Sequence, residues 1–168
     1  TYKFSRPSTA KQMIEAMLSE GSKVRTKERY EKARSLGLTF YQALTLASII
    51  EKETGAASER KLISSVFHNR LKIGMKLQSD PTVIYGIPNY NGNITKADLQ
   101  TSTPYNTYTE AGIPPTPICN PGLEAIDAAL NPDATKYLYF VAKGNGEHEF
   151  TTSYRDHQAA VAKYQLKQ

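Results

Sequence analysis

Two glutamates, Glu51 and Glu53, could carry acid–base chemistry at the end of a stretch, residues 39–55, that has the pattern of one helix. At about 100° per residue the two side chains point about 200° apart, so they cannot act as a pair on one helix face. Glu53 lies about one turn from the apolar residues Ile49 and Ile50. Glu53 is therefore the better candidate for a partly buried carboxyl group.

The position of Glu53 in the last helical turn also bears on its protonation. The C-terminus of a helix carries partial negative charge, and this field and partial burial both favour a neutral carboxyl group. A carboxyl group that holds its proton near neutral pH is suited to general-acid catalysis. The alternative is that Glu51 and Glu53 are solvated residues at a helix end, with Lys52 between them.

The helix that must position these carboxyl groups has signals at both ends. Thr39 is a good N-cap residue and Gln42 completes a capping box. Gly55 follows the last helical residue and is expected to take the left-handed conformation that ends many helices.

The rest of the chain predicts an α+β protein, mainly helical and folded as a single domain over residues 1–168. Two strands, 137–141 and 148–151, predict a C-terminal β-hairpin. A segment rich in Pro, Tyr and Asn, residues 75–120, is expected to form an ordered groove-lining surface of turns and strand pieces. Other helices are predicted at 8–20 (capped by Ser8 and ended by Gly21), 22–36 (ended by Gly37), 59–72 (capped by Ser58 and ended by Gly74), 120–131 (capped by Asn120) and after Ser153.

Composition narrows the class of ligand. The chain has 168 residues, a net charge of +5 and a pI near 9.2, which suits an acidic polymer, but no nucleic-acid-binding motif is found. Cys119 is the only cysteine and the three histidines lack metal-ligand spacing, so neither a metal nor another cofactor is expected. No apolar run is long enough to span a membrane, and we interpret the chain as a fragment of a longer protein.

Tyrosines and amides of the middle segment favour a carbohydrate ligand. Tyrosine rings stack on sugar faces, and Asn, Gln and Asp side chains bond to hydroxyl and acetamido groups. For Asn106 a purely turn-forming role is an equal alternative, and for His148 a structural or solvent-facing one. The residues predicted to line a glycan groove near Glu53 are Gln78, Asp80, Tyr85, Asn106, Tyr108 and His148.

The number of carboxylates decides between reaction types. Glycoside hydrolysis usually needs two, and here Asp80 is a candidate for the second group, from the loop. A site with one carboxyl group indicates instead a reaction in which the sugar supplies its own nucleophile.

Several ordered segments resemble the MltG-type (YceG-like) endolytic murein transglycosylases. Residues 47–54, Ala-Ser-Ile-Ile-Glu-Lys-Glu-Thr, match the motif around that family's catalytic glutamate. The segment Phe67-His68-Asn69-Arg70-Leu71 is similar to another family motif, and we count Asn69 among the substrate-binding candidates. Further similar segments, in family order, are 75–86 with Gln78-Ser79-Asp80-Pro81-Thr82, 105–108, 112–115 and 137–141.

The resemblance implies that Glu53 is the catalytic acid and base in a lytic cut between N-acetylmuramic acid and N-acetylglucosamine, which leaves 1,6-anhydro ends and limits the length of nascent strands. It also implies an N-terminal membrane anchor outside this sequence, a site on the outer, periplasmic face of the cytoplasmic (inner) membrane, and peptidoglycan synthases as possible partners. Two alternatives stay open. One is a muramidase-type hydrolase that uses Glu53 with Asp80, and the other is a non-catalytic glycan-binding module.

Overall fold

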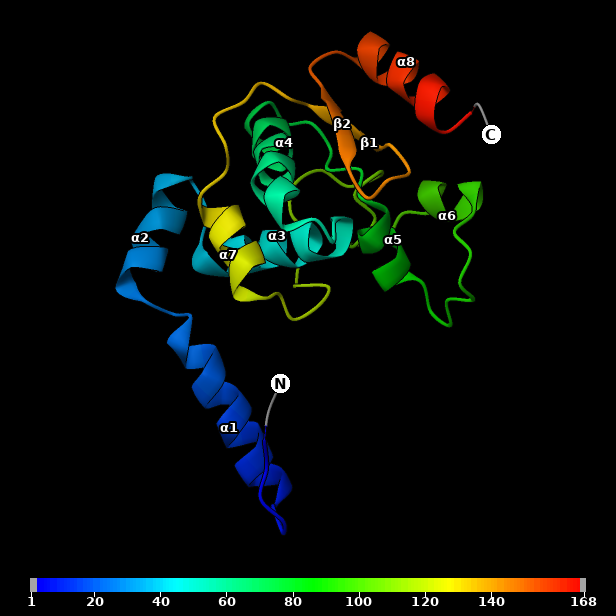
Figure 1. The fold of residues 1–168 in the computed structure, drawn as a ribbon. Helices are drawn as coiled ribbons and strands as arrows, with labels where there is room; N and C mark the ends of the chain where they lie inside the picture. Colours follow the sequence, from blue (N-terminus) through cyan, green and yellow to red (C-terminus); the bar gives the residue numbers. More distant parts are fainter. Residues whose placement is uncertain (1–2, 167–168) are drawn as a thin grey trace. The chain divides into compact units, whose positions relative to one another are not determined.

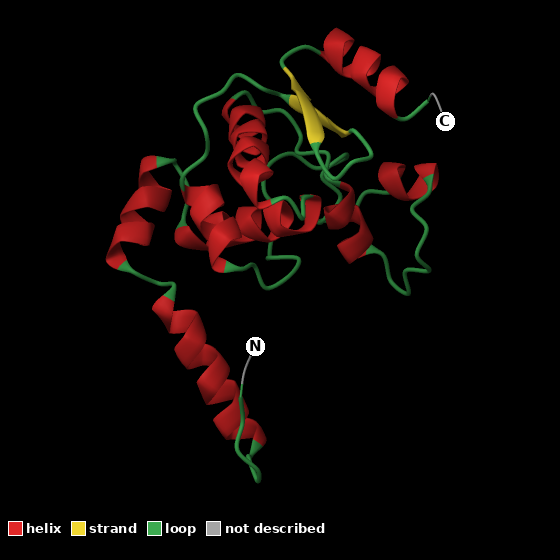
Figure 2. Cartoon of the chain, in the orientation of Figure 1, coloured by secondary structure: helices red, strands yellow, loops and turns green. Residues whose placement is uncertain are grey.

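The computed structural model describes residues 3–166, which form a mainly helical α+β structure, and this confirms the predicted class (Figures 1 and 2). The described part of the chain contains eight α-helices, one 3-10 helix and one two-stranded antiparallel sheet. The elements in order are α1 (Ala10–Lys23), α2 (Lys27–Ser35), α3 (Phe40–Glu53), η1 (Ala57–Glu59), α4 (Arg60–Lys72), α5 (Asp80–Gly86), α6 (Lys96–Gln100), α7 (Leu123–Leu130), β1 (Tyr139–Ala142), β2 (His148–Thr151) and α8 (Tyr154–Tyr164).

Backbone contacts divide the chain into two compact units, residues 1–40 and 41–168. In the first unit, α1 begins after Thr9 rather than Ser8, because Thr9 forms the capping box with Gln12. Gly21 does not end this helix, which continues to Lys23. No helix within residues 3–166 is long and apolar enough to cross a membrane.

The second helix of the first unit is shorter than the predicted 22–36. Residues 22 and 23 belong to α1, and Thr26 caps α2 by accepting the Arg29 backbone N–H, so residues 24–26 form the connection and the cap. Gly37, at φ +75°, follows its end as predicted.

The second unit is built around α3, which contributes fully buried Leu46, Ile49 and Ile50 to the core. Helices α4 and α7 pack against each other and supply most of the remaining core. The loop before α7 is tied to α3 by Ser48, whose hydroxyl accepts the Ile118 backbone N–H at 2.9 Å. The other buried apolar residues of this core include Ala43, Ala47, Ile63, Val66, Phe67, Leu77, Ala125, Ala129 and Leu130.

The end of α3 differs from the prediction. Gly55 is not in the left-handed region, because the chain leaves the helix one residue earlier, at Thr54. The Thr54 hydroxyl accepts the Ala56 backbone N–H at 2.9 Å, and this local turn replaces the glycine cap. Glu53 is consequently the last residue of the helix.

Helix α4 also begins differently. No side chain caps it, and the short helix η1 leads into it in place of a Ser58 cap. Gly74, at φ +70°, follows its end as predicted.

The middle segment contains helices α5 and α6 in place of the expected strand pieces. Asp98 completes a capping box with Thr95 at the start of α6. The Asn106 side-chain amide donates to the backbone carbonyls of Asp98, Leu99 and Thr101. These carbonyls therefore have a hydrogen-bond partner without a neighbouring strand. Local side-chain bonds therefore order this segment without a sheet.

The C-terminal hairpin and α8 form a layer beside α4 (Figure 1). Strands β1 and β2 pair antiparallel, with Tyr139 opposite Thr151 and Ala142 opposite His148. Ser153 caps α8 by accepting the Asp156 backbone N–H, as predicted. Helix α7 begins at Leu123, after Gly122, and Asn120 does not cap it.

Candidate active site

A cavity of about 500 Å³ lies in the second unit, and Glu53 at the end of α3 is part of its wall. Its other walls come from α4, the loop before α5, the hairpin and α8. Four of the predicted groove residues line it: Gln78, Asp80, Tyr108 and His148. The fold therefore brings together residues that lie far apart in the sequence around one carboxyl group.

Glu53 is partly buried, and its pKa is raised above the ordinary value of 4.5. Burial is the main cause, because it removes water from the charged form, and the nearby charge of Asp80 adds to it. The Ser79 hydrogen bond and the charges of His148 and Arg70 act in the opposite direction. The net effect favours the protonated acid.

This raised pKa makes a stability prediction. A carboxyl group with a raised folded-state pKa contributes stability below its unfolded pKa, near 4.5, and that contribution is lost as pH rises through the folded-state pKa. Glu53→Gln removes the buried charge, so we expect the free energies of unfolding of variant and wild type to be similar at acid pH. The variant should become the more stable protein as pH rises above 4.5. Urea unfolding of both proteins across this range measures the difference. A less stable variant at neutral pH would mean that Glu53 is a paired structural anion.

Ser79 holds the Glu53 carboxyl group. Its hydroxyl donates to Glu53 Oε1, its backbone N–H donates to the Thr107 hydroxyl at 2.9 Å, and its carbonyl accepts the Thr82 hydroxyl at 2.7 Å. The preceding residue, Gln78, has a φ of +50°, a left-handed conformation that costs free energy for a residue other than glycine. The fixed backbone therefore aims the Ser79 hydroxyl at the end of α3.

Asp80 begins α5 and is joined to Tyr108. The Tyr108 hydroxyl donates to Asp80 Oδ1 at 2.6 Å. Burial and this bond to a carboxylate raise the pKa of Tyr108, so the phenol stays protonated. Asp80 thus has one oxygen engaged and a solvent-exposed position at the cavity rim.

Arg70 of α4 forms another part of the wall. Its side chain is buried, with Nε donating to the Leu138 carbonyl at 2.7 Å and Nη1 donating to the Leu77 carbonyl at 2.5 Å. Its guanidinium carbon also lies 5.5 Å from the centroid of the Tyr139 ring. Arg70 therefore joins α4 to the hairpin and to the loop that carries Ser79.

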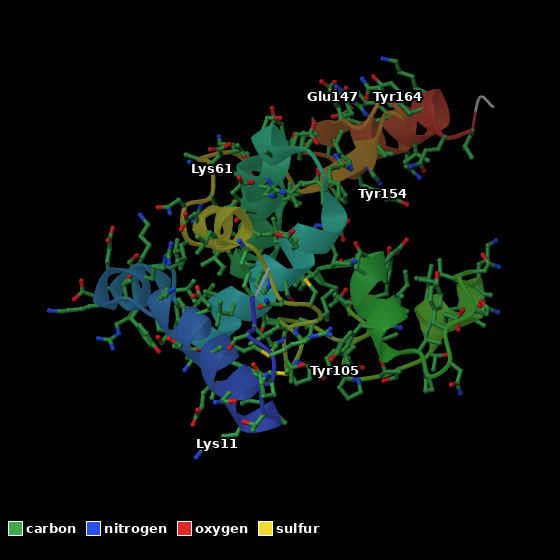
Figure 3. The ribbon with its side chains drawn as sticks, turned by 60° about the horizontal axis from the view of Figure 1, so that its bottom comes forward. Lys11, Lys61, Tyr105, Glu147, Tyr154 and Tyr164 are labelled. Carbon is green, nitrogen blue, oxygen red and sulfur yellow. The ribbon has the colours of Figure 1, made fainter. Side chains whose placement is uncertain are left out.

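An aromatic cluster of Tyr139, Tyr154 and His157 lines the side of the cavity formed by the hairpin and α8. The Tyr139 and His157 rings stack at 5.2 Å between centroids, and the Tyr139 and Tyr154 rings are 5.9 Å apart. Tyr154, at the start of α8, is 59% exposed and is labelled in Figure 3. Exposed rings of this kind offer a face for a sugar.

Glu51 lies in a different environment. Its Oε2 accepts the backbone N–H of Gly122, the residue before α7, at 3.3 Å. It does not line the cavity, which agrees with the opposite directions expected from helix geometry. Only one of the two carboxyl groups is therefore available to a ligand in the cavity.

Three predicted groove residues are not brought to the cavity. The Asn69 amide donates to the carbonyls of Thr135 and Tyr137, and the Asn106 side chain is fully buried among backbone carbonyls. Tyr85 packs edge-on against Tyr105, which is labelled in Figure 3. In Asn69 and Asn106 the amide satisfies the protein's own backbone, so neither is free for a sugar.

Sequence reasoning did not single out Arg70, Ser79 or the aromatic cluster. Ser79 and Arg70 lie inside the segments quoted for the family resemblance, so that resemblance was the available signal. Tyr154 and His157 carry no such signal, because their place in the cavity depends on how α8 packs on the hairpin.

The chain is similar to known proteins over nearly its whole length. The model of the YceG-like family matches residues 1–163. The chain is 42% identical over 166 residues to an endolytic murein transglycosylase of Bacillus subtilis, a match that covers 98% of this chain and 46% of that protein. It is 34% identical over 170 residues to an endolytic murein transglycosylase of Streptococcus pneumoniae, with 98% of this chain and 31% of that protein covered.

A solved structure agrees with these sequence matches. The crystal structure of a YceG-like protein from Listeria monocytogenes superposes with a TM-score of 0.80 at 35% identity and covers 94% of this chain and 51% of that one. The chain spans less than half the length of the two relatives above. With a family match over nearly its whole length, the chain belongs to the YceG-like family.

Proposed function

We propose that this chain is the catalytic domain of an endolytic murein transglycosylase. Its substrate would be the glycan strand of peptidoglycan, cut at the β-1,4 bond between N-acetylmuramic acid and N-acetylglucosamine. The observation that carries the proposal is Glu53, a partly buried carboxyl group with a raised pKa inside a cavity of polar and aromatic side chains. The names of the relatives support the same activity.

The proposed reaction needs one group that gives a proton and later takes one. Protonated Glu53 donates its proton to the glycosidic oxygen as the bond from that oxygen to the muramyl C1 breaks. The muramyl 6-hydroxyl then attacks C1, and the Glu53 carboxylate accepts the hydroxyl proton. The products are a new 4-hydroxyl end and a 1,6-anhydro ring. No water is consumed, and Glu53 returns to its starting state.

The environment of Asp80 supports this reaction over hydrolysis. Asp80 lines the same cavity, so a two-carboxylate mechanism has the necessary groups. However, one Asp80 oxygen already accepts the Tyr108 hydroxyl, which is held protonated. We propose that Asp80 contributes to the raised pKa of Glu53 and to substrate binding, while the sugar hydroxyl is the nucleophile.

Product analysis tests the proposed function. Purified protein is incubated with peptidoglycan strands, and the released glycans are identified by mass spectrometry. A transglycosylase gives 1,6-anhydro ends, a hydrolase gives reducing ends with one added water, and a glycan-binding module gives no cut. Reducing ends or an uncut strand would contradict the proposal.

The family resemblance also supports a proposal about where the domain acts. From the family resemblance we propose an N-terminal membrane anchor that holds the domain on the outer face of the cytoplasmic membrane, within reach of peptidoglycan synthases. Internal cutting there would limit the length of nascent strands. Comparing strand length in cells with wild-type protein and with the Glu53→Gln variant measures this effect, and longer strands are expected in the variant.

Ser79 gives a prediction about the pH profile. The Ser79 hydrogen bond favours the charged form of Glu53, so Ser79→Ala should raise the pKa of that carboxyl further. Activity is lost where the acid deprotonates, and the alkaline limb of the kcat/KM profile should therefore move to higher pH. The backbone groups of Ser79 keep their own bonds, so the variant is expected to fold.

Ser102→Ala is the matched control for Ser79→Ala. Its hydroxyl also donates to a glutamate, Glu110, at 2.8 Å, but neither residue lines the cavity. The profile of this control should coincide with that of wild type. An alkaline limb that stays in place in Ser79→Ala would separate Ser79 from the protonation of Glu53.

A further inference from the structure

Glu59 is a buried glutamate that is not among the residues lining the cavity. It is 8% exposed and lies in η1, at the start of α4. Both of its carboxylate oxygens bind the same residue: Oε1 accepts the His148 backbone N–H at 2.9 Å, and Oε2 lies 2.7 Å from His148 Nδ1. Residues 89 positions apart are thus joined by two hydrogen bonds.

The ring of His148 is fixed from other directions as well. The Phe140 ring meets it edge-on, with centroids 5.5 Å apart and an interplanar angle of 87°. The side chains of His148 and Glu59 are only 12% and 10% exposed. The imidazole therefore has a defined orientation, with its Nδ1 edge turned to the carboxylate.

The other ring nitrogen, Nε2, is the one that Glu59 leaves for a ligand. His148 lines the cavity, and within residues 3–166 no protein group bonds to Nε2. An ionised carboxylate only accepts hydrogen bonds, so Nδ1 must carry the proton that joins it to Glu59. In the neutral ring Nε2 then has a free lone pair.

We propose that Glu59 is a positioning residue that holds His148 in the Nδ1–H tautomer, so that Nε2 accepts a hydrogen bond from a glycan hydroxyl or acetamido N–H beside Glu53. That the ligand is a glycan rests on the proposed function. The position of His148 is independent of it, since His148 and Glu53 line the same cavity. A carboxylate that fixes the tautomer of a histidine is a recurring device of active sites.

The substitution Glu59→Gln tests this role. Gln keeps an oxygen for the His148 backbone N–H and places an amide N–H against Nδ1, which forces the proton to Nε2. A donor then faces the cavity where an acceptor is needed. We expect kcat/KM on peptidoglycan strands to fall about 10- to 100-fold, the usual effect of losing a residue that orients a functional histidine. The control Glu147→Gln, in the exposed turn of the same hairpin, should leave kcat/KM unchanged.

The same substitution in a His148→Gln protein distinguishes a positioning role of Glu59 from a role in supporting the fold. If Glu59 acts through His148, then Glu59→Gln should cause no further loss in a His148→Gln protein. If the substitution costs the same in both backgrounds, Glu59 only supports the fold and the proposal is overturned.

Two-bond ¹H–¹⁵N NMR correlations of the three histidines, at a pH where the imidazoles are neutral, read the tautomer directly. Wild-type His148 should carry its proton on Nδ1, and Glu59→Gln should move it to Nε2. A wild-type ring with Nε2 protonated would overturn the proposal, even if Glu59→Gln does not fold. A wild-type protein that binds but does not cut glycans would defeat the proposed function alone, because the tautomer is measured without substrate.

Discussion

Glu53→Gln is expected to abolish glycan cleavage while the protein keeps its fold. Gln has nearly the same shape as Glu, but it cannot give and reclaim a proton. Positioned acid–base catalysis contributes about 100- to 10,000-fold in rate, so the loss should be at least of that order. Release of 1,6-anhydro products measures it, and circular dichroism with thermal melting checks folding.

Glu51→Gln is the matched control, since it changes the same residue type two positions away on the same helix. Within residues 3–166 the Glu51 carboxylate accepts the Gly122 backbone N–H, which a Gln side-chain oxygen also accepts. We expect a change of less than about threefold in activity, because half-buried Glu51 does not line the cavity and a substitution away from such a site usually alters free energies by under about 0.5 kcal/mol. Equal losses in the two variants would contradict the assignment of Glu53 alone.

Arg70→Met should give the largest loss of stability. The substitution keeps most of the aliphatic volume but removes the donors to the Leu77 and Leu138 carbonyls. Burial disfavours the charged guanidinium and so lowers the pKa of Arg70, and an apolar side chain recovers part of that cost. Each buried acceptor left without a partner costs about 1–3 kcal/mol, so the orphaned carbonyls should dominate.

We therefore expect Arg70→Met to lower the free energy of unfolding by about 3 kcal/mol, measured by urea denaturation. Arg155→Met is the control, because the Arg155 side chain is 93% exposed, and its effect should stay within about 0.5 kcal/mol. Arg70→Lys keeps the charge but lacks the guanidinium fork, and it should fall between wild type and Arg70→Met. A loss below about 1 kcal/mol in Arg70→Met would mean that water or a shifted backbone satisfies both carbonyls.

Local sequence signals were sufficient to predict α3, apart from the way it ends, and the opposite directions of its two glutamates. Helical periodicity fixes the angle between Glu51 and Glu53, and the apolar residues on one face determine which carboxyl group meets the core. The hairpin, the Ser153 cap and the glycines at 37 and 74 were predictable for the same reason, because each depends on a few neighbouring residues.

The partners of the site residues were not predictable from local signals. Glu53 meets Ser79, Glu59 meets His148, and Arg70 meets Leu138 only after the chain has folded. The two buried amides show the converse. Asn69 and Asn106 have residue types suited to a sugar, yet tertiary packing directs both to backbone carbonyls. The residue type shows which hydrogen bonds a side chain can make with a ligand. The fold decides whether the protein's own backbone already makes those hydrogen bonds.

The cavity wall has a consequence for synthesis of the protein. Its residues run from Glu53 on α3 to Gln165 after α8, so the first and last contributors are separated by most of the second unit. A ribosome adds these residues in order. The contacts between the first and last residues of the cavity wall can therefore form only after the last of them has been synthesised. A nascent chain that has emerged as far as residue 136 contains Glu53 and Ser79 but lacks the hairpin and α8. The cavity that surrounds the acid is therefore assembled last, when translation of this region is nearly complete.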